Sequence, residues 1–495
     1  MHYKSSRSSL AATDTAAVLQ GLAPDGGLYL DGELERRAFD WQGCLKLSPL
    51  EMAEKILSHL LPGFEHMEEL VRRAYAGKFS AEELTPLVPV GEDFVLELFH
   101  GPTCAFKDVA LSMLPQLITA GRAQEGMKEK IVILTATSGD TGKAALEGFH
   151  DVEGTGILVF YPDAGVSPIQ KAQMVTQTGK NVKVCAVRGN FDDCQSGVKE
   201  AFAAISGSEA LQSRGMRLSS ANSINIGRLA PQVVYYFIAY AKLLEIGAIH
   251  MGDKVDFSVP TGNFGDILAG FYAKRMGLPV GTLLCASNAN KVLTDFIQTG
   301  LYDRRREFYK TTSPSMDILV SSNLERLLYY ISGGDEALVA RCMQELKEQG
   351  FYQLPGEVLA KIQAEFAAGF CTDDEAGETI RRLWQENHYL CDPHTAIAAH
   401  VARGYQEKAP EKRPMVILST ASPYKFPAAV LKAIGGELTG DEFTQSERLE
   451  KLSGVPIPKS LRGLQEREVL HRDVIDREEI IDYVLRQLSE MEARI

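Results

Sequence analysis

The sequence predicts an α/β fold with two doubly wound parallel-sheet domains and a small N-terminal domain. From about residue 95 onward, short runs rich in β-branched residues alternate with longer stretches of helical periodicity, which is the pattern of βαβ units. The chain has 495 residues, of which 45% are hydrophobic, so it is long enough to bury two or three packed units. Ligands of such sheets bind at the carboxyl ends of the strands, and candidate site residues are sought there.

The domain boundaries follow from where this alternation starts and where it is interrupted. Residues 1–93 show no alternating series of strands and form the predicted N-terminal domain. Residues 94–250 form the first α/β domain, and residues 251–495 form the second, with a helical insertion at about 296–390 and a helical C-terminal tail. The predicted strands are 94–99, 130–137, 156–161, 182–187, 254–260, 281–286 and 415–418. The predicted helices include 50–61, 67–76, 107–121, 335–349, 375–384 and 478–491.

Composition narrows the class of protein. The formal net charge of −13 argues against a duplex nucleic acid as partner, because a phosphate backbone needs a concentrated basic stripe. No apolar run approaches the length needed to cross a bilayer, and we expect a cytoplasmic protein with no membrane partner. The eight cysteines contain no CxxC pair. Cys391 and His394 are three residues apart, but no second pair stands near them, so no metal site is predicted.

Lys107 is the first candidate for chemistry. It follows the predicted strand 94–99 by a short turn and opens a helix, where the positive end of the helix dipole disfavours a cation. The neighbouring Ala105 and Phe106 suggest an apolar setting, which also favours the neutral amine that imine formation requires. The alternative is that Lys107 points to solvent and pairs with Asp108, and for this lysine taken alone that alternative is favoured.

Two loops that follow strands have the composition of anion sites. Residues 135–142 (TATSGDTG) and 259–266 (VPTGNFGD) each join a predicted strand to a helix through glycines, where backbone N–H groups bind a carboxylate or a phosphate. The first loop lacks P-loop spacing, and the second lacks GxGxxG. For the second loop alone, a plain tight turn is an equally good interpretation. A phosphorylated aldehyde cofactor needs both an amine and an anion-binding loop, so the combination is informative.

Two further segments place polar groups at the same edge. Residues 220–228 (SANSINIGR) offer amides, a hydroxyl and the guanidinium of Arg228, which suits a substrate phosphate. The alternative is a helix N-cap followed by a surface arginine. Residues 418–426 (LSTASPYKF) end the last predicted strand with hydroxyls, one of which is suited to face a pyridine nitrogen. By itself this segment is typical of a strand-end turn.

Together these segments resemble the threonine synthase family, which belongs to the fold-type II pyridoxal-phosphate enzymes with a fold like that of the tryptophan synthase β-subunit. The likeness begins with HYKSSR at 2–7 and continues through ELFHGPT at 97–103 and AFKD at 105–108. It then includes the TATSGDTG, SANSIN and GNFGD motifs and PHTA at 393–396, and so covers nearly the whole chain.

The resemblance implies pyridoxal 5'-phosphate as cofactor and a role for each matching residue. Lys107 is the lysine that carries the cofactor as an imine and moves protons, and Thr420 meets the pyridine nitrogen. Asp140 lies beside the phenolic oxygen of the ring. A carboxylate repels a phosphate, so we expect the Asp266 side chain to turn outward or cap its helix while backbone N–H groups bind. The implied cofactor-binding residues are Lys107, Asp140, Gly262, Asn263, Phe264, Gly265, Asp266 and Thr420.

The implied reaction converts O-phospho-L-homoserine and water into L-threonine and phosphate by γ-elimination and β-addition of water, the last step of threonine biosynthesis. The alternatives are a dehydratase of serine or threonine, a lyase that releases a keto acid, and a binding protein without turnover. Which of Arg228 and Lys425 holds the substrate phosphate stays open, as does the choice between monomer and homodimer. The implied substrate-binding residues are Ser138, Thr141, Ser223, Asn225, Arg228 and Lys425.

Overall fold

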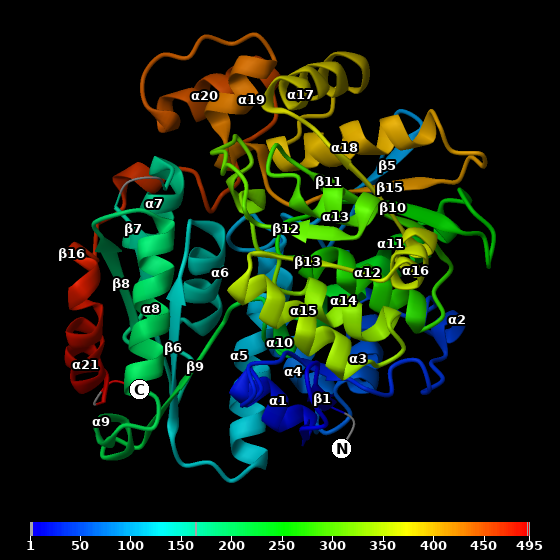
Figure 1. Ribbon diagram of the computed structural model, residues 1–495. Coiled ribbons are helices and arrows are strands. Elements are labelled where there is room, and N and C mark those ends of the chain that lie inside the picture. The colour runs from blue at the N-terminus through cyan, green and yellow to red at the C-terminus, as the bar shows by residue number, and fades with distance from the viewer. Residues whose placement is uncertain (1–2, 164–165, 493, 495) are drawn as a thin grey trace.

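Two separate sheets organise the chain, which a computed structural model describes over residues 3–163, 166–492 and 494. His2, the first residue of the N-terminal motif, lies outside the described residues. One sheet stands at the left of Figure 1, and the second lies at the upper right, with helices around both. The α/β class and the parallel strands expected from the sequence are therefore confirmed.

The left-hand sheet has five strands that are all parallel to one another, in the order β16-β8-β7-β6-β9. Alternate residues of β6 (Lys130–Ala136) face opposite sides. Ile131 and Ile133 join the main hydrophobic core, and Val132 and Leu134 pack with helices α8 and α21. The sheet is thus covered on both faces, as parallel sheets require. The other elements are β7 (Thr155–Pro162), β8 (Val182–Val187), β9 (Met216–Ser219), β16 (Asp473–Ile475), α8 (Phe191–Ile205) and α21 (Ile480–Met491).

The right-hand sheet has six strands in the order β14-β11-β10-β15-β5-β4, and only β4 runs antiparallel to its neighbour. α12 (Gly265–Arg275) and α18 (Pro393–Gln406) pack against opposite faces, because their apolar residues belong to different core clusters. The strands are β4 (Leu87–Val90), β5 (Asp93–Glu97), β10 (Val255–Pro260), β11 (Val280–Ser287), β14 (Phe366–Phe370) and β15 (Met415–Ser419).

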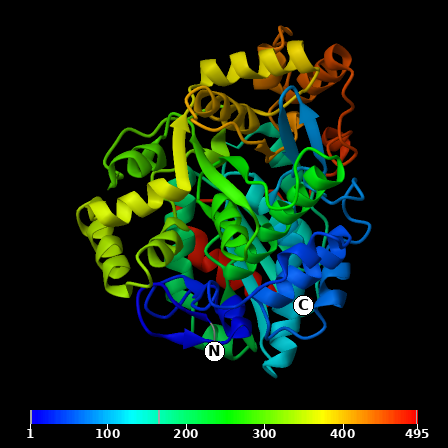
Figure 2. The same cartoon turned by 90° about the vertical axis from the view of Figure 1, so that its right-hand side faces the viewer.

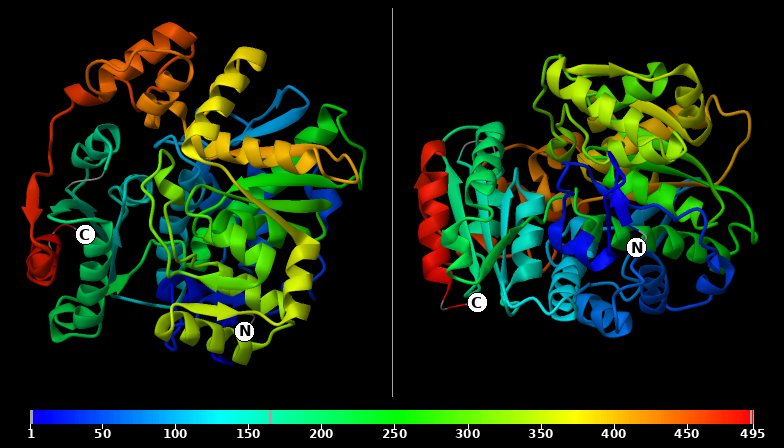
Figure 3. Two further views of the ribbon diagram at one scale, coloured as in Figure 1. Left: turned by 45° about the horizontal axis from the view of Figure 1, so that its top comes forward. Right: turned by 60° about the horizontal axis from the view of Figure 1, so that its bottom comes forward.

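Strand pairing corrects the predicted domain limits at two places. β5 was expected in the 94–250 domain, but it pairs with β15 in the six-stranded sheet. The C-terminal tail was expected to belong to the second α/β domain, residues 251–495, yet its strand β16 pairs with β8 at the edge of the five-stranded sheet. Both views of Figure 3 show this red segment along that outer edge. A strand's own residues set its burial but not its partner, so the sequence pattern does not distinguish the two sheets.

The N-terminal region contains strands as well as the expected helices. β1 (Tyr3–Ser5), β2 (Ala11–Ala12) and β3 (Tyr29–Asp31) form a small antiparallel sheet that the sequence pattern did not show. The expected helices are present as α3 (Pro49–Leu60) and α4 (Met67–Tyr75). Their buried residues join the main core, and Figure 2 shows this blue region at the lower part of the molecule.

The predicted insertion at 296–390 is not purely helical. It holds α14 (Leu324–Ile331), α15 (Glu336–Glu348), α16 (Gly356–Glu365) and α17 (Asp373–Asn387), but it also supplies β14 and the pair β12 (Leu301–Asp303) and β13 (Phe351–Gln353). No helix in the described part of the chain is long and apolar enough to span a bilayer.

Candidate active site

Lys107 is held at the carboxyl edge of the six-stranded sheet. It is the first residue of α5 (Lys107–Gln124), and the turn before it is tied to the end of β15. The N–H of Phe106 donates to the carbonyl of Thr420 over 2.8 Å, and the N–H of Leu98 donates to that of Ser419 over 2.9 Å. The residues just before Lys107 therefore contact Thr420 at the carboxyl edge, where the neighbouring strands β5 and β15 end.

The Lys107 ammonium lies in a buried, charged environment. Its side chain is 11% exposed, and Nζ is 3.9 Å from Oδ2 of Asp140. Burial lowers the pKa of Lys107 to about 8; Asp140 opposes this shift, while Lys425 and Arg228 add to it. A substantial fraction of neutral amine is thus present near pH 8, which suits attack on a carbonyl carbon.

Asp108 does not pair with Lys107, so the alternative in which Lys107 points to solvent and pairs with Asp108 is wrong. The Thr103 N–H donates to Oδ2 of Asp108 over 2.8 Å, and the Thr103 hydroxyl donates to Oδ1 over 2.6 Å. Burial raises the pKa of Asp108 to about 6 in spite of these bonds. A Cβ at Gly101 would lie 2.4 Å from the Asp108 side chain, so the turn closes only with glycine there.

Asp140 is the first residue of α6 (Asp140–Phe149). Oδ1 accepts hydrogen bonds from Nζ of Lys425 over 2.6 Å and from Nε2 of Gln170 over 2.8 Å. Burial opposes ionisation, but Lys425 and Lys107 outweigh it and hold the pKa of Asp140 well below its usual range. Asp140 is therefore a carboxylate shared by two buried lysines.

The loop before Asp140 is built by Thr137. Its hydroxyl oxygen accepts the N–H of Gly139 over 3.0 Å and that of Gly142 over 2.9 Å. Gly139 has a φ of 146° and packs so closely on Gln170 that a Cβ would lie 2.5 Å from that side chain. Ser138 and Thr141 belong to the same turn, and both side chains are partly exposed beside Asp140.

Lys425 and Arg228 differ in how their charges are balanced. Lys425 is fully buried, and Nζ is engaged by Asp140 and by the carbonyl of Thr103 at 3.1 Å. Arg228 is 3% exposed, and its guanidinium donates to the carbonyl of Ala221 over 2.5 Å. Within the described residues no carboxylate pairs with Arg228, and its Nε has no hydrogen-bond partner. A buried cation without a counter-ion is costly and suits an anionic ligand.

Asn225 acts as the N-cap of α10 (Ile226–Leu229). Its Oδ1 accepts the N–H of Gly227 over 2.9 Å, and its Nδ2 donates to the carbonyls of Val18 over 2.8 Å and Ser220 over 3.4 Å. The side-chain amide thus has partners for both donors, which matches the capping alternative considered for this segment. Ser223 is partly buried, and its hydroxyl lies 3.5 Å from that of Ser322.

The loop 262–266 joins β10 to α12 and is held from behind by another segment. A Cβ at Gly262 would lie 2.7 Å from the carbonyl of Ser315, and the Ser321 hydroxyl donates to the Gly262 carbonyl over 2.8 Å. Asn323 donates to the carbonyl of Asn263 over 3.1 Å, and Phe264 has a left-handed φ of 61°. The loop is therefore rigid, and the first N–H groups of α12 have no acceptor within their own helix.

Asp266 is buried, so the expectation that it turns outward is wrong. It is 6% exposed, and Oδ1 accepts hydrogen bonds from Tyr235 over 2.5 Å and Tyr236 over 3.2 Å. Among the residues described, none bonds to its Oδ2. Burial raises the pKa of Asp266 to about 7, although both tyrosines lower it. The sequence does not mark these tyrosines as site residues, because a Tyr-Tyr pair in an apolar helix is typical of a core.

Thr420 is buried directly after β15, and the PHTA segment supports the same strand end. The hydroxyls of Thr395 and Ser419 lie 2.9 Å apart, and Asp392 caps α18 by accepting the N–H groups of His394 and Thr395. The PHTA motif therefore positions the end of β15.

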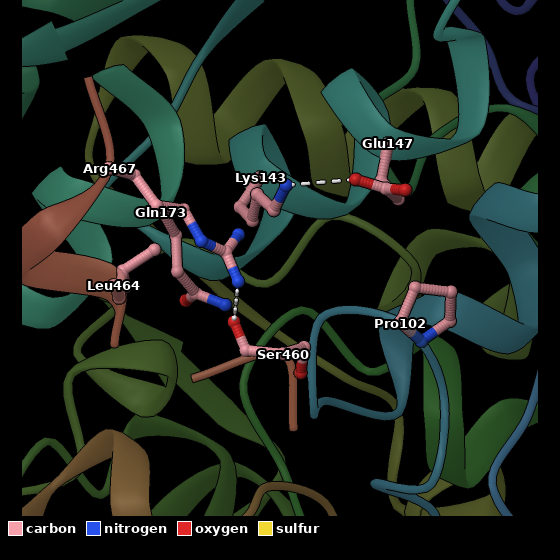
Figure 4. Close-up of a pocket in the computed structure, with 7 residues that line it drawn as sticks. All are labelled: Pro102, Lys143, Glu147, Gln173, Ser460, Leu464 and Arg467. Atoms are coloured by element: carbon pink, nitrogen blue, oxygen red, sulfur yellow. Dashed lines mark hydrogen bonds and ion pairs between the residues drawn. The ribbon is translucent and has the colours of Figure 1, made fainter. Parts of the chain in front are cut away.

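A cavity of about 250 Å³ lies beside the lysine turn, lined by side chains of α6, α7 (Pro168–Val175) and the 460–467 segment (Figure 4). The Gln173 side chain lines it and donates to the carbonyl of Thr103 over 3.4 Å. Lys107 is not among the lining residues, so this cavity adjoins the candidate site without containing it. The lining residues are Pro102, Lys143, Glu147, Gln173, Ser460, Leu464 and Arg467.

These groups fit a phosphorylated aldehyde cofactor and a phosphorylated substrate. A buried amine faces the carboxylate of Asp140, and an unpaired guanidinium lies close enough to affect its pKa. The loop 262–266 offers helix N–H groups, and the Asp266 carboxyl beside them has a pKa of about 7, so it is partly protonated near neutral pH. A carboxyl that is protonated does not repel a phosphate, so the donor set is consistent with phosphate binding.

Comparison with known proteins agrees with this chemistry. Residues 80–421 match the family described as pyridoxal-phosphate dependent enzyme, and residues 395–484 match the family described as threonine synthase, C-terminal. Threonine synthase of Saccharomyces cerevisiae is 37% identical over 514 residues, covering 96% of this chain and 98% of the yeast protein. Threonine synthase-like 1 of Pongo abelii is 39% identical over 84% of this chain, which spans only 57% of that relative's length.

Among solved structures, the chain is similar to pyridoxal-phosphate-bound threonine synthase from Brucella melitensis. The TM-score is 0.87 at 41% identity, and the match covers 100% of this chain and 99% of that one. The region 80–421 contains Lys107, Asp140, Arg228, the loop 262–266 and Thr420. The similarity thus includes both sheets and every loop of the candidate site.

Proposed function

The chain belongs to the threonine synthase family of pyridoxal-phosphate-dependent enzymes, and from this premise we propose that it converts O-phospho-L-homoserine and water into L-threonine and phosphate. The observation that carries the proposal is the buried Lys107 amine beside the Asp140–Lys425 ion pair, with an unpaired Arg228 nearby. When bound, pyridoxal phosphate supplies an electron sink for the reacting carbons. The protein supplies binding, orientation and proton transfer.

Lys107 holds and moves the protons in this proposal. An amine with a pKa near 8 both accepts and releases a proton at neutral pH, which is the property of an efficient general base and acid. Asp140 lies 3.9 Å away and remains ionised, so it stabilises the protonated form of Lys107 without taking its proton. The ion pair with Lys425 fixes the position of Asp140.

Arg228 rather than Lys425 is proposed to bind the substrate phosphate. The charge of Lys425 is already balanced by Asp140, and its Nζ also donates to Thr103. Arg228 keeps its charge and a free Nε, and the fork of a guanidinium suits phosphate oxygens. Asn225 is proposed to position Arg228 by capping α10, and Ser223 to contact the same phosphate.

The remaining assignments divide between cofactor and substrate. Ser138, in the loop before α6, and Thr141, in the first turn of that helix, are proposed to bind the substrate carboxylate through hydroxyl and N–H groups. The N–H groups of 262–266 and the Asp266 carboxyl are proposed to bind the cofactor phosphate. The Thr420 hydroxyl is proposed to meet the pyridine nitrogen, a position that its buried place after β15 supports.

Product analysis tests the reaction. Purified protein with pyridoxal phosphate and O-phospho-L-homoserine is expected to release phosphate and threonine in equal amounts. Phosphate together with a keto acid and ammonia, but no threonine, would identify a lyase and contradict the proposal. Turnover of serine or threonine in place of the phosphorylated substrate would indicate a dehydratase.

A spectroscopic test separates catalysis from binding. Adding substrate is expected to change the visible absorbance of the cofactor in the wild-type protein, and the original absorbance returns as the substrate is consumed. In Lys107→Ala the absorbance is expected to change without returning, because the group that moves the protons is missing. Arg228→Met is expected to raise KM and weaken competition by inorganic phosphate, whereas a change in kcat alone would argue against a phosphate contact.

A cytoplasmic location and a monomeric or homodimeric state complete the proposal, and cell fractionation and sedimentation test them.

A further inference from the structure

Three side chains with metal-binding atoms that take no part in the candidate active site converge where α17 begins beside α18. Cys371 directly follows β14, Glu375 lies in the first turn of α17, and His400 lies in the middle of α18. Their sulfur, oxygen and nitrogen atoms all lie within 4.8 Å of one another. α17 and α18 run close together at the top right of Figure 1.

Two of these side chains are oriented by contacts of their own. The backbone N–H of Cys371 donates to the carbonyl of Ser287 over 3.0 Å, which fixes the thiol at the end of the sheet. One oxygen of Glu375 accepts the N–H and the hydroxyl of Thr372, each over 2.8 Å, in a capping box. The second oxygen lies 4.0 Å from Nε2 of His400. Such outer contacts orient the ligands of metal sites.

The geometry points to a zinc site formed by Cys371, Glu375 and His400, with water as the fourth ligand. Thiolate, imidazole and carboxylate together favour zinc over magnesium or calcium, which prefer oxygen alone. Cys371 is fully buried, whereas the His400 and Glu375 side chains are 36% and 44% exposed. One side is therefore closed by protein, and the other is open to an arriving ion and a water molecule.

Charge and proton balance support this assignment. A thiolate and a carboxylate together neutralise the two charges of Zn²⁺. A cysteine thiol without a metal is ordinarily protonated at neutral pH. Zinc replaces that proton, forming an S–Zn bond and releasing one H⁺ to solvent. This site is independent of the proposed catalytic activity, and the sequence pattern did not predict it because His400 is distant from the other two residues.

Cobalt substitution tests the site in the complete protein with its cofactor bound. After treatment with a chelator, one equivalent of Co²⁺ is expected to produce a near-ultraviolet thiolate-to-cobalt absorption band, which Zn²⁺ then abolishes. Zinc binding is expected to release about one proton per protein, seen with a pH indicator. A wild-type protein that shows no thiolate band, or binds zinc without releasing a proton, overturns the proposal.

Variants separate this site from other metal binding. His400→Gln and Glu375→Gln are expected to weaken zinc affinity by at least roughly tenfold, and Cys371→Ser to remove the band. His250→Gln is the matched control, because His250 is 96% exposed and has only an aspartate beside it. If Cys371→Ser fails to fold, the variants at the partly exposed Glu375 and His400 still show whether these residues bind the metal. A band and an affinity that stay unchanged in both of those variants overturn the proposal.

Discussion

Asp140 and Asp266 occupy similar places in the two sheets but carry opposite electrostatic states. Each lies in the first turn of a helix that follows a parallel strand, and they are 4% and 6% exposed. Asp140 is surrounded by Lys425, Lys107 and the amide of Gln170, and its pKa is held well below the usual range. Oδ1 of Asp266 accepts hydrogen bonds from two tyrosine hydroxyls, and burial raises its pKa to about 7, although the tyrosines and Lys107 lower it.

The difference shows that neither burial nor a helix start determines the charge of a carboxyl group. Both residues share those two features, so the neighbouring side chains decide. Cations keep Asp140 ionised where it faces the reactive amine. At Asp266 the tyrosine hydroxyls do not offset the effect of burial, so the carboxyl is only partly ionised near pH 7. It lies at the loop proposed to bind a phosphate, where a full negative charge would be repulsive.

The largest expected effect comes from Asp140→Asn. This change leaves Lys107 and Lys425 buried without their shared carboxylate, so the free energy of unfolding at pH 7 is expected to fall by about 3–5 kcal/mol in denaturant titrations. Asp163→Asn is the control, because Asp163 pairs with Lys171 at 3.2 Å with both side chains more than 40% exposed. The control is expected to cost no more than ~1 kcal/mol. Equal losses in the two variants would show that the buried pair of Asp140 stabilises the fold no more than the exposed pair of Asp163 does.

Asp266→Asn is expected to act in the opposite direction. The folded-state pKa of Asp266 lies near 7 against an ordinary value of 3.8, so the folded protein holds more protons, and its stability falls as pH rises through 7. At pH 8 the asparagine variant is expected to be more stable than wild type by roughly 2–4 kcal/mol. This advantage should vanish near pH 4. Unfolding measured at both pH values checks this, and a difference independent of pH contradicts it.

A smaller effect is expected from Lys425→Met on the titration of Lys107. Lys425 lowers the pKa of Lys107 by repulsion. Its removal also leaves Lys107 as the only one of the two lysines that pairs with Asp140. The pKa of Lys107 is therefore expected to rise by roughly one unit, which corresponds to about 1.4 kcal/mol. The pH dependence of the reaction of this amine with pyridoxal phosphate measures the shift. An unchanged profile would mean that the two lysines are not coupled.

The smallest effect is expected at the tyrosine pair. Tyr235→Phe removes the shorter of two hydrogen bonds to Asp266 and is expected to cost about 1 kcal/mol of stability while raising the pKa of that carboxyl. Tyr236→Phe removes a contact of 3.2 Å to the same carboxyl together with a 2.9 Å bond to the backbone carbonyl of Asp266, so it is expected to cost a similar amount of stability but to raise the pKa of the carboxyl less. The pH dependence of denaturant unfolding compares the two variants. A larger rise of the pKa in Tyr236→Phe would contradict this order.

Sequence patterns predicted the fold class and the strands whose residues are strongly β-branched, such as β6, β8 and β10. They missed β9 and β16, which have four and three residues and too little alternation to stand out. The motifs predicted Lys107 and Thr420 after two different strands, and the structure pairs those strands as neighbours. The pairing of Asp140 with Lys425 joins distant segments, and local periodicity contains no information about it.

Asp266 shows why side-chain state was harder to predict than location. The motif placed it at the end of β10, and the structure agrees. Its orientation depends on Tyr235 and Tyr236, which come from a different helix and are ordinary core residues by pattern. The charge of a buried group therefore followed from tertiary contacts that only the folded chain displays.

The pairing of β16 with β8 has a consequence for how the protein emerges from the ribosome. The other four strands of that sheet are complete once Ser219 has been made, but one edge of β8 stays unpaired until residues 473–475 appear. At ~5–20 residues per second this interval lasts on the order of tens of seconds. An open edge of a buried strand is a template for wrong pairing, so the nascent chain depends on protection during that time.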